Sequence, residues 1–185
     1  DSNRFKQRQS DKRSTWLLLL VPVLVLFGGT LLIDFNGLYG QDSHTYLSFA
    51  KELKAEWITG NKAASFFWPK GYSASGAALS FTGLSVLWSL RIVSLLSLIG
   101  SLFIARSIIR FMWNKDGSLF LMLAAATQIY FVRAGFLVMS DMLTAFLILA
   151  LIYAYLRFVK ESSLRWLLAV FCFAALAFFS RYACV

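Results

Sequence analysis

The chain has 185 residues, of which 59% are hydrophobic and only 15% are charged, whereas a soluble globular domain carries about 25% charged residues. This composition excludes an ordinary soluble domain and indicates an integral membrane protein. The formal net charge of +9 does not indicate nucleic-acid binding, because no RNA- or DNA-binding motif accompanies it and the Lys and Arg residues cluster between apolar runs. The two Cys residues form no CxxC motif and no Cys/His cluster, so neither a zinc site nor a disulfide framework is indicated.

The N-terminal segment 1–14 is polar and basic, and it precedes an apolar run over 15–33. This run is close to the ~20 residues that a helix needs to cross a bilayer. A cleaved signal peptide is the alternative, but the run is too long for one and no Ala-x-Ala site follows it. We therefore predict a cytoplasmic basic tail, 1–14, and a single transmembrane domain over 15–185, whose outer-side loop and interfacial helices occupy 34–90.

The longest polar interval, 37–72, opens with a pattern that predicts an amphipathic helix lying in the membrane interface. Apolar side chains recur over 42–58 at spacings of three and four residues: Tyr46, Phe49, Ala50, Leu53 and Trp57. Gly60 and Asn61 are expected to end this helix. An aromatic loop, 63–72, follows it and suits the headgroup zone.

The next segment, 73–90, is apolar but interrupted by Gly76 and Gly83, so it can be read as a span or as a partly embedded helix. The positive-inside rule favours the second reading, because it keeps Arg106, Arg110 and Lys115 inside. The later spans are then 91–112, 117–132, 138–158 and 164–180. The predicted fold is an all-α, polytopic helical membrane protein with about five transmembrane helices and with interfacial amphipathic helices on the outer side.

This topology brings charged residues from the whole chain to the outer side, where they can share one site: Asp34, Asp42, Lys70, Arg133, Asp141 and Arg181. Asp42 and Asp141 can together hold a divalent cation or divide base and orienting roles between them. The alternative is that each carboxylate simply begins a helix, where the helix dipole favours it.

Four basic side chains remain to be interpreted. His44 can donate to a phosphate or be an ordinary surface residue. Arg133, expected in a short turn near Asp141, can form an ion pair or contact a phosphate. Arg91 and Arg181 lie at predicted span ends, where extension of the side chain toward lipid headgroups is the usual explanation.

The order of these residues resembles the N-terminal half of GT-C glycosyltransferases, of the bacterial aminoarabinose-transferase and protein-mannosyltransferase type. It consists of Asp42-x-x-x-Tyr46 after a first span, an interfacial helix, the Trp-Pro-Lys-Gly-Tyr loop containing Lys70, and Arg133 ahead of Ser140-Asp141. The resemblance implies transfer of a sugar from a polyprenyl-phosphate carrier to an acceptor outside the cytoplasmic membrane. It implies Asp42 and Asp141 as catalytic or metal-binding residues, and Tyr46, Lys70, His44 and Arg133 as substrate-binding residues.

The sequence departs from that family at Ser43, which replaces a usual second acidic residue, and at His44, where a small residue is common. A divalent cation is therefore an open alternative, and no other cofactor is expected. Family members have more spans, so we expect this chain to be the N-terminal part of a larger protein. The expected location is the bacterial inner membrane, with a cytoplasmic N-terminus and a periplasmic site.

Two other functions compete with the enzyme. A noncatalytic membrane subunit can keep this fold while it binds other membrane subunits or lipid. A transporter ranks third, because it needs charged or broken helices near the middle of the membrane, and the acidic residues here fall at its surface.

Overall fold

The computed structural model describes residues 16, 20, 24, 28 and 34–182, and every regular element within 34–182 is a helix. The predicted all-α class is confirmed. The basic tail, 1–14, lies outside the described residues, as does the first predicted span, 15–33, apart from the four isolated positions.

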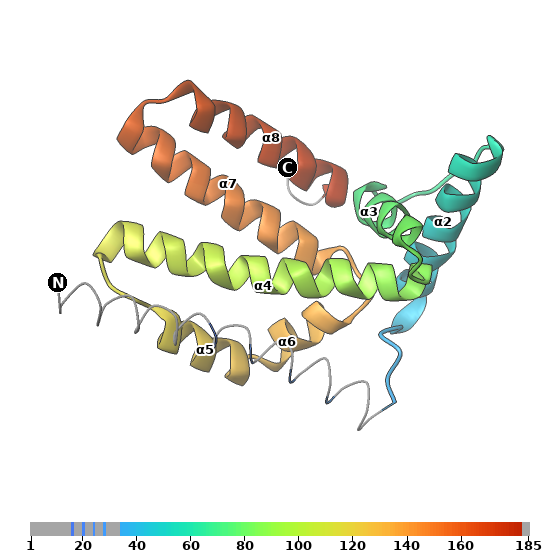
Figure 1. The fold of residues 1–185 in the computed structure, drawn as a ribbon, viewed down its shortest axis with the longest axis horizontal. Helices are drawn as coiled ribbons and strands as arrows, with labels where there is room; N and C mark the ends of the chain where they lie inside the picture. The colour runs from blue at the N-terminus through green and yellow to red at the C-terminus, as the bar shows by residue number, and fades with distance from the viewer. Residues whose placement is uncertain (1–15, 17–19, 21–23, 25–27, 29–33, 183–185) are drawn as a thin grey trace.

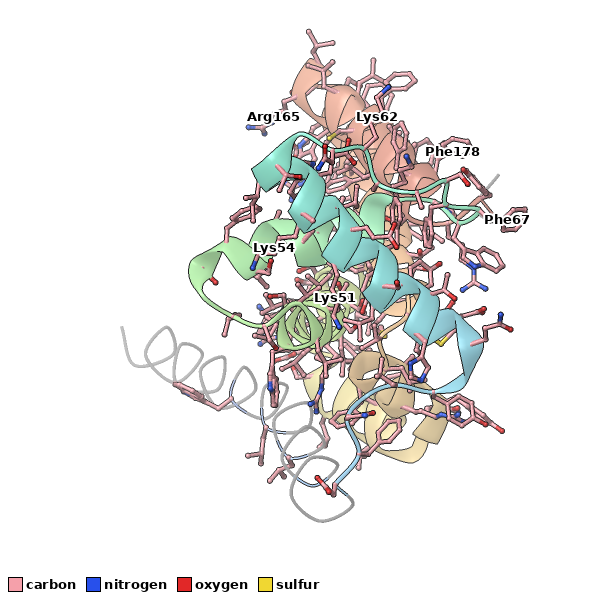
Figure 2. The ribbon with its side chains drawn as sticks, turned by 90° about the vertical axis from the view of Figure 1, so that its right-hand side faces the viewer. Lys51, Lys54, Lys62, Phe67, Arg165 and Phe178 are labelled. Atoms are coloured by element: carbon pink, nitrogen blue, oxygen red, sulfur yellow. The ribbon has the colours of Figure 1, made fainter. Side chains whose placement is uncertain are left out.

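α4, α7 and α8 run side by side along the longest axis of the molecule with α5 and α6 beside α4 (Figure 1), and α2 and α3 pack across one end of them, which Figure 2 views face on. α7 packs against both α4 and α8, and α3 packs against α2, α4 and the end of α8. The helices are α2 (Gly40–Thr59), α3 (Gly71–Leu79), α4 (Val86–Trp113), α5 (Ser118–Thr127), α6 (Ile129–Phe136), α7 (Asp141–Glu161) and α8 (Leu164–Ser180), with a 3-10 turn η1 (Ser80–Thr82) after α3.

Two of the described helices, α4 and α7, are long and apolar enough to cross a membrane. At a rise of about 1.5 Å per residue they measure about 42 Å and 32 Å, against a hydrocarbon core of about 30 Å. α8 is apolar but shorter, with 17 residues. The structure thus supports a helical membrane protein, and the number of five spans stays a prediction.

The predicted span 117–132 is not one helix. It is divided into α5 and α6 at Gln128, whose φ of −89° and ψ of 83° are not helical. Arg133 consequently lies in the last turn of α6. Our prediction that it lies in a short turn between spans was wrong. Gln128 is neither Gly nor Pro, so the sequence carries no local signal for this break.

The segment 73–90 is also not one continuous helix, and its position relative to the membrane stays a prediction. It is divided between α3, which has 9 residues, the turn η1 and the first residues of α4. Ser85 caps α4 by accepting a hydrogen bond from the backbone N–H of Trp88 at 3.3 Å, so α4 begins before the predicted start at Arg91.

This earlier start corrects our interpretation of Arg91. Its side chain does not extend toward headgroups from a span end but is buried, with 3% exposure. The guanidinium lies over the rings of Trp88 and Phe136, at 4.1 Å and 4.7 Å from their centroids. Aromatic faces attract a cation and so replace part of its hydration.

The interfacial helix predicted over 42–58 is α2, and its buried face includes Tyr46, Phe49, Ala50 and Leu53, as expected. The prediction for Trp57 was wrong, because this residue lies in the last turn with 48% of its surface exposed. Gly60 ends the helix in a left-handed conformation, and its N–H bonds to the carbonyl of Glu56. The aromatic loop returns over this face, where Phe66 stacks on Phe49 with 3.9 Å between centroids.

The opposite end of the bundle carries the basic residues predicted to face inward. Lys160 lies 4.9 Å from the ring centroid of Phe111, which places the ends of α7 and α4 side by side. Arg106 forms an ion pair with Asp116 at 3.0 Å, and this hydrogen bond holds the pKa of the Asp116 carboxyl well below its usual range. The two predicted inner loops therefore share one end of the molecule.

Candidate functional site

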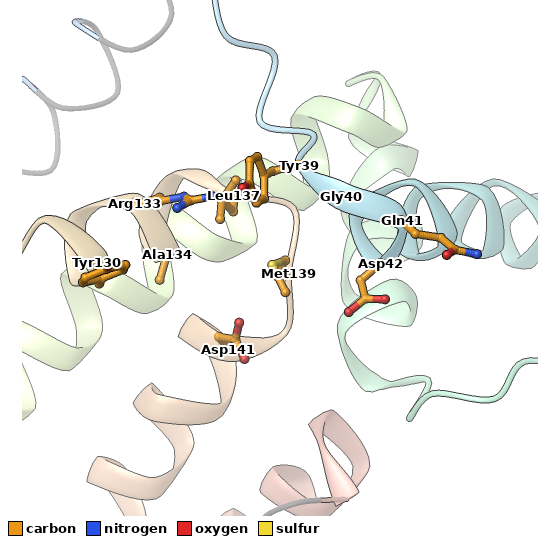
Figure 3. A pocket seen from close by; sticks show the side chains of 10 residues that line it. All are labelled: Tyr39, Gly40, Gln41, Asp42, Tyr130, Arg133, Ala134, Leu137, Met139 and Asp141. Carbon is orange, nitrogen blue, oxygen red and sulfur yellow. The ribbon is translucent and has the colours of Figure 1, made fainter.

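A pocket of about 500 Å³ lies where the N-terminal ends of α2 and α7 meet the C-terminal end of α6 (Figure 3). It contains Asp42, Arg133 and Asp141, which are widely separated in the sequence. Its full lining is Tyr39, Gly40, Gln41, Asp42, Tyr130, Arg133, Ala134, Leu137, Met139 and Asp141.

The connection between α6 and α7, residues 137–140, forms one wall of this pocket and is fixed by three hydrogen bonds from different elements. The N–H of Val138 donates to the carbonyl of Gly37 at 2.9 Å. Ser94 Oγ donates to the carbonyl of Leu137 at 2.9 Å. The hydroxyls of Tyr46 and Ser140 lie 3.0 Å apart in a buried contact, directly before Asp141.

Gly37 is required for the first of these bonds. Its φ is +86°, which side-chain-bearing residues rarely adopt, and a Cβ there would lie 3.0 Å from the carbonyl oxygen of Phe136. The segment that precedes α2 can thus approach the end of α6 closely.

Tyr72 of α3 is fully buried and supports the same wall through Ser94. Its hydroxyl lies 3.0 Å from the carbonyl oxygen of Leu90 and 2.8 Å from Ser94 Oγ, which in turn bonds to Leu137. Burial raises the pKa of Tyr46 and of Tyr72, so both hydroxyls stay protonated and available for these bonds. A buried polar network that is satisfied in this way rigidifies the site it supports.

Both carboxylates lie in the first turns of their helices. Asp42 lies in the first turn of α2 and is exposed, and Asp141 is the first residue of α7. Each therefore lies where the helix dipole favours negative charge. The two readings left open for these residues are compatible, because both helix starts open into the same pocket.

Asp141 forms an ion pair with Arg181, which follows the end of α8. α7 and α8 are antiparallel, so the residue after the second helix lies beside the residue that begins the first. We expected Arg181 to extend toward lipid headgroups from a span end. Its side chain instead contacts Asp141.

Arg133 contributes the positive charge among the lining residues. Its guanidinium stacks on the ring of Tyr39, 4.0 Å from the centroid. Within the part of the chain that the structure describes, Arg133 forms no ion pair. Arg133 thus lines the pocket without a carboxylate partner among the described residues, and the predicted phosphate contact stays a prediction.

The other three predicted substrate-binding residues do not line the pocket. Tyr46 is 4% exposed and acts on the pocket wall through Ser140. Lys70, the residue before α3, is exposed, and its ammonium lies 5.5 Å from the ring centroid of Phe49. His44 is exposed on α2.

The sequence of the helical bundle matches a known family. The model of the dolichyl-phosphate-mannose-protein mannosyltransferase family matches residues 77–185, more than half of the chain. The chain belongs to this family. No curated protein and no solved structure matches it.

Membership confirms the resemblance drawn from the sequence and implies a membrane glycosyltransferase of the GT-C type. The family match contains Arg133, Asp141 and Arg181, whereas Asp42 and Tyr46 precede it. The family match therefore gives no support for a role of Asp42 in the site, and the support for that role is its position in the pocket lining.

The donor set does not form a metal site ready for a cation. Among the described residues, no three His, Cys, Asp or Glu side chains lie close enough to share a metal ion. Asp141 is already paired with Arg181, so a divalent cation on Asp42 and Asp141 would have to displace a guanidinium and complete its coordination from substrate phosphate. The predicted cation stays a prediction.

A second cavity, of about 580 Å³, adjoins the pocket between α4, α5, α6 and α7 and shares Tyr130 with it. Its lining is mostly aliphatic: Leu102, Ala105, Leu121, Ala124, Ala125 and Leu149, with Ser101, Gln128 and Tyr130.

The sequence did not indicate that Tyr39 and Tyr130 line the site. It placed Ser140 before Asp141 and Arg181 on the outer side, but it predicted neither the contact of Ser140 with Tyr46 nor the pairing of Arg181 with Asp141. For Arg181 a signal exists, because two consecutive spans joined by a short loop are antiparallel, and position 181 then falls beside position 141. The aromatic residues gave no signal, since a Tyr at a membrane interface is ordinary.

Proposed function

We propose that this protein takes part in moving a sugar from a polyprenyl-phosphate carrier to an acceptor on the outer side of the bacterial cytoplasmic membrane. The observation that carries the proposal is the pocket that combines Asp42, Arg133 and Asp141 at the end of an apolar helix bundle. Family membership supports glycosyl transfer, and the pocket supplies the side chains for it.

Asp42 is the proposed base. The acceptor hydroxyl oxygen attacks C1 of the sugar, and the bond between C1 and the phosphate oxygen breaks. The electron pair leaves with the polyprenyl phosphate, and the acceptor proton passes to the Asp42 carboxylate. Asp42 is suited to this role because it is exposed at the pocket and has no ion-pair partner among the described residues.

Arg133 is the proposed contact to the departing phosphate. A guanidinium presents several N–H donors in a plane and binds phosphate oxygens in pairs. Stacking on Tyr39 holds the plane of Arg133 in place. The N-terminal ends of α2 and α7 add the partial positive charge that favours anions.

The second cavity supports a lipid-linked donor. An isoprenoid chain is apolar, and an aliphatic cavity that shares Tyr130 with the charged pocket offers it a path away from the phosphate. Membrane lipid is the surrounding medium of such a site. The separation of the pocket from the basic end of the bundle supports a periplasmic site with a cytoplasmic N-terminus.

The deciding experiment measures sugar transfer by the full-length protein in proteoliposomes containing a radiolabelled polyprenyl-phosphate sugar. Asp42→Asn keeps the side-chain shape and removes the charge, and turnover should fall by ~10² or more with expression preserved. Lys51→Gln, an exposed change on the same helix, is the matched control. Normal transfer by Asp42→Asn would remove Asp42 as the base.

The second candidate is a noncatalytic membrane subunit of a larger complex. It is favoured by the contacts that give predicted site residues structural partners, Asp141 with Arg181 and Tyr46 with Ser140. If the wild-type protein transfers no polyprenyl-phosphate sugar, alone or with its copurifying partners, the subunit function replaces the enzyme.

A further inference from the structure

We infer that Arg181 is a positioning residue that neutralises Asp141 and so allows the pocket to accept an anionic phosphate. This inference deepens the proposed function and depends on it. The residue lies outside the pocket lining and acts through Asp141, with which it forms an ion pair.

The backbone delivers Arg181 to this position in a fixed way. Its N–H donates to the carbonyl of Ala177 at 2.9 Å, and Ser180 beside it is buried. The start of α3 presses on the end of α8, because a Cβ on Gly71 would lie 2.7 Å from the carbonyl oxygen of Phe179. The end of α8 is therefore held between α3 and the start of α7.

The charge balance of the pocket explains why the pairing of Arg181 with Asp141 affects phosphate binding. The lining residues carry two negative charges, on Asp42 and Asp141, and one positive charge, on Arg133. Those three alone would give a net negative pocket that repels a phosphate. Arg181 offsets the charge of Asp141, and the lining then balances before the helix N-termini add their partial positive charge.

The expected size of the effect is moderate, because the pair is partly open to solvent. The side chains of Arg181 and Asp141 are 44% and 38% exposed, and exposed pairs are screened by water and salt. Loss of the guanidinium should weaken phosphate binding by roughly fivefold at low salt, and less at high salt.

The test measures binding of decaprenyl phosphate to the full-length protein in nanodiscs, at low and high salt. Arg181→Gln should weaken binding by about fivefold, and Arg181→Lys should restore most of it. Arg165→Gln is the matched control, because Arg165 also forms an ion pair, with Glu161 at 2.9 Å, at the other end of the bundle. Its binding should match the wild type.

The decisive variant is the double change Arg181→Gln with Asp141→Asn. Because removal of the negative charge makes the guanidinium unnecessary, the double variant should bind as well as Asp141→Asn alone. An equal loss in both backgrounds, or wild-type binding by Arg181→Gln, would overturn the inference. If the wild-type protein itself does not bind decaprenyl phosphate, the proposed function is wrong, and the inference about Arg181 is wrong with it. If the wild-type protein and Arg181→Gln bind equally well, the inference alone is wrong. Unfolding temperatures of all variants show whether any loss comes from misfolding.

Discussion

Tyr46 offers the sharpest distinction between direct substrate binding and support of the pocket wall. The change Tyr46→Phe removes one oxygen atom and keeps the ring, which packs edge to face against Tyr72 and Phe66 with centroids 5.4 Å and 5.8 Å away. What is lost is the buried contact between the Tyr46 and Ser140 hydroxyls at 3.0 Å.

The size of the effect follows from that contact. A neutral hydrogen bond contributes about 1 kcal/mol of net stability, and an orphaned buried partner costs about 1–3 kcal/mol. Ser140 is the residue before α7, and its side chain makes no capping bond in the present structure. The Ser140 backbone is helical, with φ −72° and ψ −11°, so the released hydroxyl is not placed to cap α7. We therefore expect a loss of about 1–3 kcal/mol. For a chain of this size, each 1 kcal/mol lowers the unfolding temperature by about 2–4 °C.

The functional consequence should exceed the loss of stability, because Ser140 immediately precedes Asp141. Ser140→Ala should reproduce the effect of Tyr46→Phe on sugar transfer, and the double variant should be no worse than either single variant. The assay compares kcat and KM for the polyprenyl-phosphate sugar together with unfolding temperatures in detergent. If the two losses add in full, or if Ser140→Ala is normal while Tyr46→Phe raises KM, Tyr46 contacts substrate directly and the reasoning is wrong.

Two further predictions concern the topology and the phosphate. A Cys at exposed Asn61 should react with an impermeant thiol reagent in intact cells and a Cys at exposed Lys115 should not; labelling at Lys115 would contradict the assignment of the basic end to the cytoplasm. Arg133→Ala should raise the KM for the donor about tenfold or more, because it removes charged hydrogen bonds, whereas Lys70→Ala should have a smaller effect. A reversed order would show that Lys70 moves to the phosphate.

The sequence predicted α2 to within two residues, because its apolar period and Gly60 are local signals. It also placed Asp42, Arg133 and Asp141 on one side from charge counting alone, and they line one pocket. The environment of Arg91 was not predictable in this way. A rule about span ends assumes a lipid-facing side chain, whereas two aromatic rings from different helices enclose this one.

The contacts that complete the pocket depend on how helices end relative to one another, which composition and periodicity do not encode. The break at Gln128 lets α6 extend to Phe136, so that Arg133 faces Tyr39. The antiparallel return of α8 brings Arg181 back to Asp141. Both features place a cation within a group of helix starts that already carries two carboxylates. A pocket that holds both a carboxylate base and a departing phosphate needs these cations, because two negative charges placed close together repel each other unless positive charge offsets them.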